Sequence, residues 1–171
     1  SYQLLNVQTG IQDKKAFLDR LTQEENYKLI HLKRENKAKQ ALSIIYAFYR
    51  GQWHNQQGSK QKIAKRFELD PNTYLHFLKE LSILEKFEQE MINNREHLSL
   101  VYERDLRDAT QYNKTMERLS GFLDVPIAKP ESKLQKVTPS KLSDMISNRD
   151  ALIEAIRNSD FSEHVEAFEK M

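Results

Sequence analysis

Side chains that can bind phosphate are concentrated in one part of the chain. Residues 28–66 carry ten Lys or Arg and one acid, Glu35, which gives a net charge of +9, although the whole chain carries only +2. Residues 67–108 carry −5 and residues 140–171 carry −3. Such a basic segment predicts a local positive field that attracts nucleic acid, and the alternative interpretation is a solvated helix face.

Polar side chains that can hydrogen-bond to base edges follow the basic segment. They fall on the outward face of a helix predicted to begin at Pro71, and they are Asn72, Thr73, His76 and Lys79. Asparagine suits adenine and lysine suits guanine. The alternative interpretation is that Asn72 and Thr73 only cap the first turn of the helix.

Signatures of catalysis, metal binding and membrane insertion are missing from the sequence. Cysteine is absent, the four glycines form no phosphate-binding loop, and the five histidines lack ligand spacing. We therefore expect no enzyme activity, no catalytic residue, no metal and no cofactor. No apolar segment approaches the roughly 20 residues that span a bilayer, and no secretory signal is evident. The expectation is a cytoplasmic protein that does not bind a membrane.

Aromatic residues near the middle of the basic segment allow two interpretations. Tyr46, Phe48, Tyr49 and Trp53 could provide a platform on which the bases of a single strand stack. Their helical spacing favours packing in the core instead, and we adopt that second interpretation.

The elements that position these residues are predicted to be mainly helices, because Gly and Pro are rare and Lys, Glu, Gln and Leu are common. Capping signals predict helix starts at Asp13, Thr22, Ser59 and Asp70. The helix that follows Thr22, whose partner in a capping box is Glu25, is expected to extend over 23–50 and to end at Gly51. The helix that follows Ser59 is short and covers 60–67.

One β-hairpin is predicted after the second helix of this pair. Residues 87–92 and 97–103 flank the turn at 93–96, and the second of them alternates in polarity. Further along, residues 105–123 show helical spacing, residues 124–139 contain three of the four prolines, and residues 140–171 carry apolar stripes typical of helices.

The order helix, short turn, helix and hairpin is the basis of a resemblance. In SKQKIAKRFELDPNTYLHFLKELSILEKF (residues 59–87), Ala64 is small where two helices must cross, Asp70 and Pro71 start the second helix, and its inner stripe is Tyr74, Leu78 and Leu81. Residues 37–104 resemble the winged helix-turn-helix superfamily of DNA-binding domains. The glycine common in the turn of that superfamily is replaced by Glu68.

The resemblance implies a role for each part of this segment. The recognition helix is 71–84, and its base contacts are Asn72, Thr73, His76 and Lys79. The first helix contacts the DNA backbone through Ser59, Lys60, Lys62, Lys65 and Arg66. The wing contacts DNA through Asn93, Asn94 and Arg95.

Five consecutive parts are therefore expected: an N-terminal helical extension (1–36), the winged domain (37–104), a packing or dimerisation helix (105–123), a Pro-containing linker (124–139) and C-terminal helices (140–171). The expected function is sequence-specific binding of double-stranded DNA by a homodimer, as a transcriptional regulator or as an accessory factor for replication, partition or transfer of a mobile element. The alternative is a helical protein–protein interaction module that uses the winged helix to contact a partner, as Leu75 and the acidic residues after Phe67 suggest.

Overall fold

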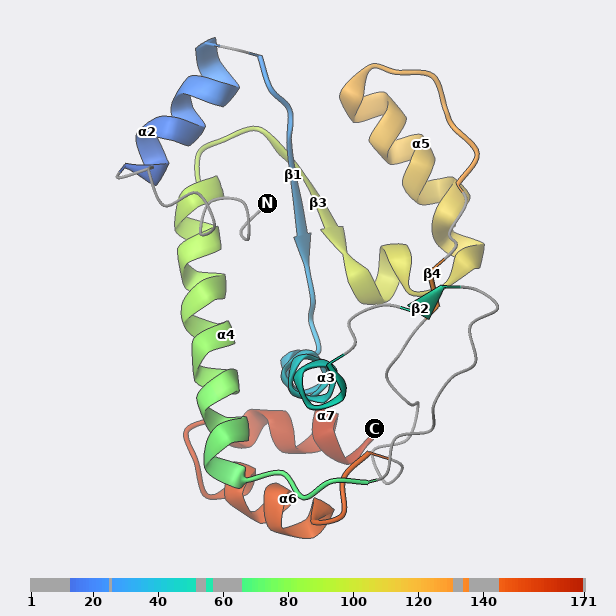
Figure 1. The fold of residues 1–171 in the computed structure, drawn as a ribbon. Coiled ribbons are helices and arrows are strands. Elements are labelled where there is room, and N and C mark those ends of the chain that lie inside the picture. Colours follow the sequence, from blue (N-terminus) through green and yellow to red (C-terminus); the bar gives the residue numbers. More distant parts are fainter. Residues whose placement is uncertain are drawn as a thin grey trace. The chain divides into compact units, whose positions relative to one another are not determined.

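The computed structural model describes residues 13–24, 26–51, 55–56, 66–130, 134–135 and 145–170. This part of the chain is mainly helical, as the composition predicts (Figure 1). It forms two compact units, each assembled from segments far apart in the sequence. Unit 1 comprises residues 1–35 and 83–130, and unit 2 comprises residues 36–82 and 131–171. Across the described ranges, no helix is long and apolar enough to cross a membrane.

Unit 1 is organised around a two-stranded parallel sheet. Strand β1 (Leu29–Lys33) pairs with β3 (His97–Val101), with Leu29 opposite His97 and Lys33 opposite Val101 (Figure 1). Parallel strands need a long connection, because the chain must return to the same end of the sheet before the second strand begins. The other elements of unit 1 are α2 (Lys14–Asp19), α5 (Tyr112–Leu123), π-helical turns at Arg20–Glu24 and Tyr102–Leu106, and a 3₁₀ turn at Ala109–Gln111.

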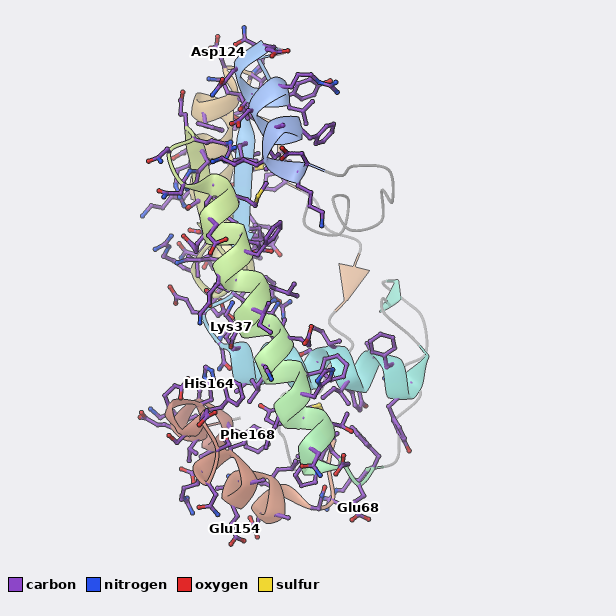
Figure 2. All side chains as sticks on the ribbon, turned by 90° about the vertical axis from the view of Figure 1, so that its left-hand side faces the viewer. Lys37, Glu68, Asp124, Glu154, His164 and Phe168 are labelled. Atoms are coloured by element: carbon purple, nitrogen blue, oxygen red, sulfur yellow. The ribbon has the colours of Figure 1, made fainter. Side chains whose placement is uncertain are left out.

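Unit 2 is a cluster of helices around an apolar core. Its helices are α3 (Lys37–Arg50), the first three turns of α4 (Pro71–Ile92), α6 (Arg149–Arg157) and α7 (Val165–Glu169), with a 3₁₀ turn at Ser162–His164. The short strands β2 (Asn55–Gln56) and β4 (Leu134–Gln135) pair in antiparallel fashion. The side chains of α6 divide by exposure, and Glu154, labelled in Figure 2, lies on its solvent side.

The core of unit 2 joins all four helices. Its fully buried members include Leu42 of α3, Leu78 of α4, Ile156 of α6 and Phe168 of α7. Tyr74 is also fully buried, and its hydroxyl donates a hydrogen bond of 3.0 Å to the carbonyl of Ala38. Its ring meets the ring of Phe168 edge-on at 5.3 Å. Burial raises the pKa of the Tyr74 phenol, so this hydroxyl remains a donor throughout the physiological pH range.

Helix α4 begins as the capping signal predicts. The carboxylate of Asp70 accepts hydrogen bonds from the backbone N–H groups of Asn72 and Thr73, and Pro71 takes the first helical position. The predicted inner stripe of Tyr74, Leu78 and Leu81 is buried. Helix starts at Asp13 and the helix end at Gly51, where φ is +63°, are confirmed as well.

The predicted β-hairpin is wrong. Residues 87–92 are the last turns of α4, which is 22 residues long, and residues 97–101 pair with β1 in parallel rather than with the preceding segment. The sequence from 85 to 92, EKFEQEMI, is rich in good helix formers, so the helix continues to the Asn-Asn turn. The turn itself is correctly located, and it connects a helix to a strand.

The predicted helix over 23–50 is wrong in its first half. The Thr22 hydroxyl donates back to the carbonyl of Leu18 at 2.8 Å, which is a bond of a helix end, so Thr22 caps no new helix. Asn26 has a φ of +59°, which breaks the helix, and β1 follows. The helix actually starts at Asn36, whose side chain accepts from the N–H of Lys39 at 2.8 Å.

The remaining predictions concern the second half of the chain. The single helix predicted over 105–123 is found only over its second part, as α5, and the end of the π-helical turn at Tyr102–Leu106 and the 3₁₀ turn precede it. Of the predicted Pro-containing linker (124–139), the described residues 125–130 contain no helix or strand, whereas Leu134–Gln135 form β4. Of the apolar residues predicted to form stripes on the C-terminal helices, Leu152, Ile153 and Ile156 are buried on α6. Met145 and Ile146 are also buried, but they lie in a turn and a β-bridge before α6 and not in a helix.

Candidate nucleic-acid interface

Most of the residues predicted to contact the DNA backbone lie outside the described part of the chain. Ser59, Lys60, Lys62 and Lys65, together with Ala64 and residues 60–65 of the short helix predicted over 60–67, fall outside the described residues. The last two residues of that predicted helix, Arg66 and Phe67, are not helical. Arg66 is described, and it is exposed. It immediately precedes Phe67, which pairs with Ile146 in a parallel β-bridge.

The segment from Phe67 to Pro71 is tightly held within unit 2. The Phe67 N–H donates to the carbonyl of Met145, and the side-chain amide of Asn148 binds both backbone groups of Leu69, accepting from its N–H at 3.0 Å and donating to its carbonyl at 2.9 Å. Glu68, labelled in Figure 2, is exposed between these two anchored residues. These bonds fix the direction in which the chain enters α4.

The predicted base-contacting residues are brought together on one face of α4. Asn72, Thr73, His76 and Lys79 are all exposed, because the opposite face of the helix carries the buried stripe. Asn72, His76 and Lys79 follow one another at spacings of four and three, which places them in a row along the helix. The exposed Glu80 adds a negative charge beside this row.

Thr73 is committed to capping. Its hydroxyl donates to Asp70 at 2.9 Å and its backbone N–H donates to the same oxygen at 3.0 Å. These two bonds, followed by the one from the Asn72 N–H, hold the pKa of Asp70 below its ordinary value, so the carboxylate is ionised at neutral pH. The capping interpretation therefore describes Thr73, and the side chains that remain for readout are Asn72, His76 and Lys79.

The predicted wing residues lie in unit 1 at the turn between α4 and β3. Asn93 and Asn94 are exposed, and Asn94 has a left-handed φ of +62°. The Arg95 side chain is only 5% exposed, and its guanidinium donates to Asp19 at 2.6 and 3.0 Å and to the carbonyl of Met91. Arg95 therefore ties the turn to α2. The sequence could not indicate this because Asp19 is 76 residues away.

Two aromatic side chains that the sequence analysis assigned to the core are exposed instead. Tyr46 is buried as expected, but Phe48 is 62% exposed and Tyr49 is 55% exposed. The ring of Tyr49 stacks on Phe67 with centroids 4.3 Å apart and planes 17° apart, and Phe48 meets Phe77 of α4 at 6.4 Å. Trp53 lies outside the described residues. The helical spacing of these aromatic residues predicted burial, but of the three on α3 only Tyr46 lies on the buried face of the helix.

Among the described residues, the most buried charged groups lie in unit 1. The Asp105 carboxylate is 6% exposed and accepts from Arg118 at 2.8 Å, from Arg104 at 3.2 Å and from the backbone N–H of Val101 at 2.6 Å. The pKa of Asp105 lies below its ordinary value, mainly because of the hydrogen bond from Arg104. The Val101 bond and the charge of Arg118 lower this pKa further. Every polar atom of the carboxylate is therefore occupied by structural bonds.

A second pair in unit 1 joins the buried His31 to the partly exposed Glu88. Their side-chain atoms Nε2 and Oε2 are 3.2 Å apart, and the His97 ring lies edge-on to His31 at 6.3 Å. In the part of the chain that the structure describes, no group of three His, Cys, Asp or Glu side chains could hold a metal ion.

Comparisons of the chain with protein-family models, with curated proteins and with solved structures returned no match.

Proposed function

We propose that this chain is a sequence-specific protein that binds double-stranded DNA through unit 2. The observation that carries the proposal is the exposed face of α4, where Asn72, His76 and Lys79 form a row of hydrogen-bonding side chains on a rigidly capped helix. An α-helix fits the major groove, and amide, imidazole and ammonium groups provide the donors and acceptors that distinguish base pairs.

The charge of unit 2 supports a nucleic-acid partner. Residues 36–66 contain seven Lys or Arg and no acid. Phosphate contacts are proposed for the five residues that the resemblance assigns to the backbone, which are Ser59, Lys60, Lys62, Lys65 and Arg66. Because four of the five are cationic, their combined contacts release counterions and give a slope of about −3.6 in a plot of log affinity against log salt.

Binding as a homodimer is part of the proposal. One helix reads few base pairs, and two copies on a two-fold site double the number of contacts. The biological role proposed is regulation of transcription or an accessory step in replication, partition or transfer of a mobile element. The stripe of α6 is occupied by the core of its own unit, so it is not the dimer contact that we propose.

The test is fluorescence anisotropy with a labelled random-sequence duplex at a series of salt concentrations. The affinity of the wild type should fall roughly 150-fold between about 50 and 200 mM salt. Arg66→Glu should weaken binding and make the slope shallower by about 1. Lys114→Glu reverses the charge of an exposed lysine on α5, outside the proposed contact, and it should match the wild type. A complex that is insensitive to salt, or no complex, contradicts the proposal.

A protein–protein interaction module is the second candidate, and the exposed Phe48 and Tyr49 favour it. Under this alternative, Arg66→Glu leaves the capture of a protein partner unchanged, whereas replacement of Phe48 abolishes it. Under DNA binding, Arg66→Glu has the larger effect on duplex affinity.

A further inference from the structure

Two neighbouring rings at the end of α3 are more than half exposed, and this is unusual for side chains of their size. Phe48 and Tyr49 present 62% and 55% of their surface to solvent, whereas Tyr46, one turn earlier, presents 2%. Large aromatic side chains are mostly buried in folded domains, and a cluster of exposed ones marks a binding surface more often than a random position does.

The two rings are held in place by other rings of unit 2. Tyr49 lies flat against the buried Phe67, with centroids 4.3 Å apart, so one face of Tyr49 is occupied and its orientation is fixed. Phe48 contacts Phe77, and Phe77 contacts His76 at 6.3 Å. The two exposed rings therefore pack on rings below them. Phe77 connects Phe48 with His76 on the exposed face of α4.

The charge beside these rings indicates the kind of ligand. Two arginines adjoin the aromatic cluster in the chain. Arg66 is exposed and adjoins Phe67, on which Tyr49 stacks. Arg50 follows Tyr49 directly, and its guanidinium lies 5.6 Å from the ring centre of Tyr46. Aromatic faces beside arginines suit a ligand that is flat, apolar on its faces and negatively charged along its backbone.

From this arrangement we propose that Phe48 and Tyr49 form a base-stacking site for single-stranded DNA. The unpaired bases stack on the two rings, and Arg50 and Arg66 neutralise neighbouring phosphates. Paired bases inside a duplex cannot reach these rings, because their faces are covered by neighbouring base pairs. The site is therefore a second one, distinct from the duplex-binding face of α4, and it does not depend on that face.

The test measures the anisotropy of a labelled oligothymidine of about 12 nucleotides, a length within the range bound by known single-strand sites. Phe48→Leu keeps an apolar side chain but removes the aromatic face, and it should weaken binding about tenfold. Phe48→Tyr keeps the ring and should stay within about twofold of the wild type. Tyr27→Leu makes the matching change at another exposed ring, outside unit 2, and should have no effect. Circular dichroism and thermal unfolding confirm that each variant is folded.

Salt dependence separates stacking from charge. The ratio of wild-type to Phe48→Leu affinity should stay nearly constant as salt rises, because stacking involves no counterion release. The ratio of wild-type to Arg66→Glu affinity should shrink over the same range.

Three results would overturn the proposal: no binding of oligothymidine by the wild type, equal affinities of Phe48→Leu and the wild type, or an equal loss in Tyr27→Leu. The first result would assign the rings to a protein partner. A blunt duplex titrated in parallel keeps the two proposals apart, since Phe48→Leu should leave duplex affinity unchanged.

Discussion

The buried carboxylate of Asp105 provides the sharpest test of the structure of unit 1. Replacement by asparagine keeps the shape of the side chain and removes its charge. In the wild type, one carboxylate oxygen accepts from Arg118 and Arg104, and the other accepts from Arg104 and the Val101 N–H. Both oxygens therefore face donors. In either orientation of its amide, an asparagine must turn its NH₂ group toward donors that the wild-type carboxylate accepts from.

The cost of Asp105→Asn follows from these contacts. Breaking a buried ion pair costs about 3–5 kcal/mol. The side chain of Arg118 is 33% exposed and that of Arg104 is 62% exposed, so water solvates both cations in the variant and reduces the cost. We expect the free energy of unfolding to fall by about 2–3 kcal/mol. Asp108→Asn is the matched control, because exposed Asp108 caps a turn through Thr110 and asparagine caps equally well.

The pH dependence gives an independent check on the same variant. Because the folded-state pKa of Asp105 lies below its ordinary value of 3.8, the stabilisation is complete above that value. It is lost as the pH falls further, through the folded-state pKa. The difference between wild type and Asp105→Asn should therefore stay constant from about pH 7 to pH 5 and shrink below about pH 4.

The assay is urea unfolding followed by circular dichroism, with hydrogen exchange of the Val101 amide as a local measure. The variant should also show faster exchange of that amide, since its acceptor is weakened. A difference below about 0.5 kcal/mol at pH 7, a value typical of exposed pairs, would refute the reasoning. So would a difference that does not change as the carboxylate titrates.

Three further predictions concern backbone conformation and unit 2. Gly51→Ala places a side chain at φ +63° and should destabilise the protein by about 1 kcal/mol. Gly121→Ala lies inside α5, where a Cβ meets nothing within 4 Å, and should stabilise the protein by about 0.5 kcal/mol. Thermal unfolding of both variants checks the two signs. Asn148→Ala removes both bonds to Leu69 and should cost about 1–3 kcal/mol in urea unfolding. Tyr74→Phe removes the hydroxyl bond to the buried carbonyl of Ala38 and should cost about 1 kcal/mol, and a cost near zero would show that this bond is not made.

Local signals in the sequence predicted the parts of the fold that depend on neighbouring residues. The caps at Asp13 and Asp70 and the left-handed end at Gly51 each involve groups within four residues of one another. The buried stripe of α4 follows from the same short-range periodicity. Those features located the exposed face of α4 correctly, and with it the row of Asn72, His76 and Lys79.

Long-range pairings account for the rest. The partner of residues 97–101 is residues 29–33, and no local pattern distinguishes a strand that pairs with a distant parallel strand from one that folds back into a hairpin. The Asn148 clamp on Leu69 spans 79 residues, and the Arg95 bond to Asp19 spans 76. For the same reason the compact units interleave segments of the sequence, whereas consecutive domains were expected.

Aromatic exposure was the other feature that periodicity misjudged. Tyr46, Phe48 and Tyr49 lie close together on α3. Only one side of a surface helix contacts other elements, so only part of such a cluster is buried. Which part is buried depends on the neighbouring helices, and their positions are not written in the local sequence.

The central claim is that the exposed face of α4 contacts double-stranded DNA, and one measurement tests it most directly. It is the affinity of wild type, Lys79→Glu and Lys114→Glu for the same labelled duplex at one fixed salt concentration. We expect Lys79→Glu to lose at least about tenfold in affinity, because a groove contact is lost, while Lys114→Glu binds as the wild type does. Equal affinities of all three proteins, or an equal loss in the two variants, would contradict it.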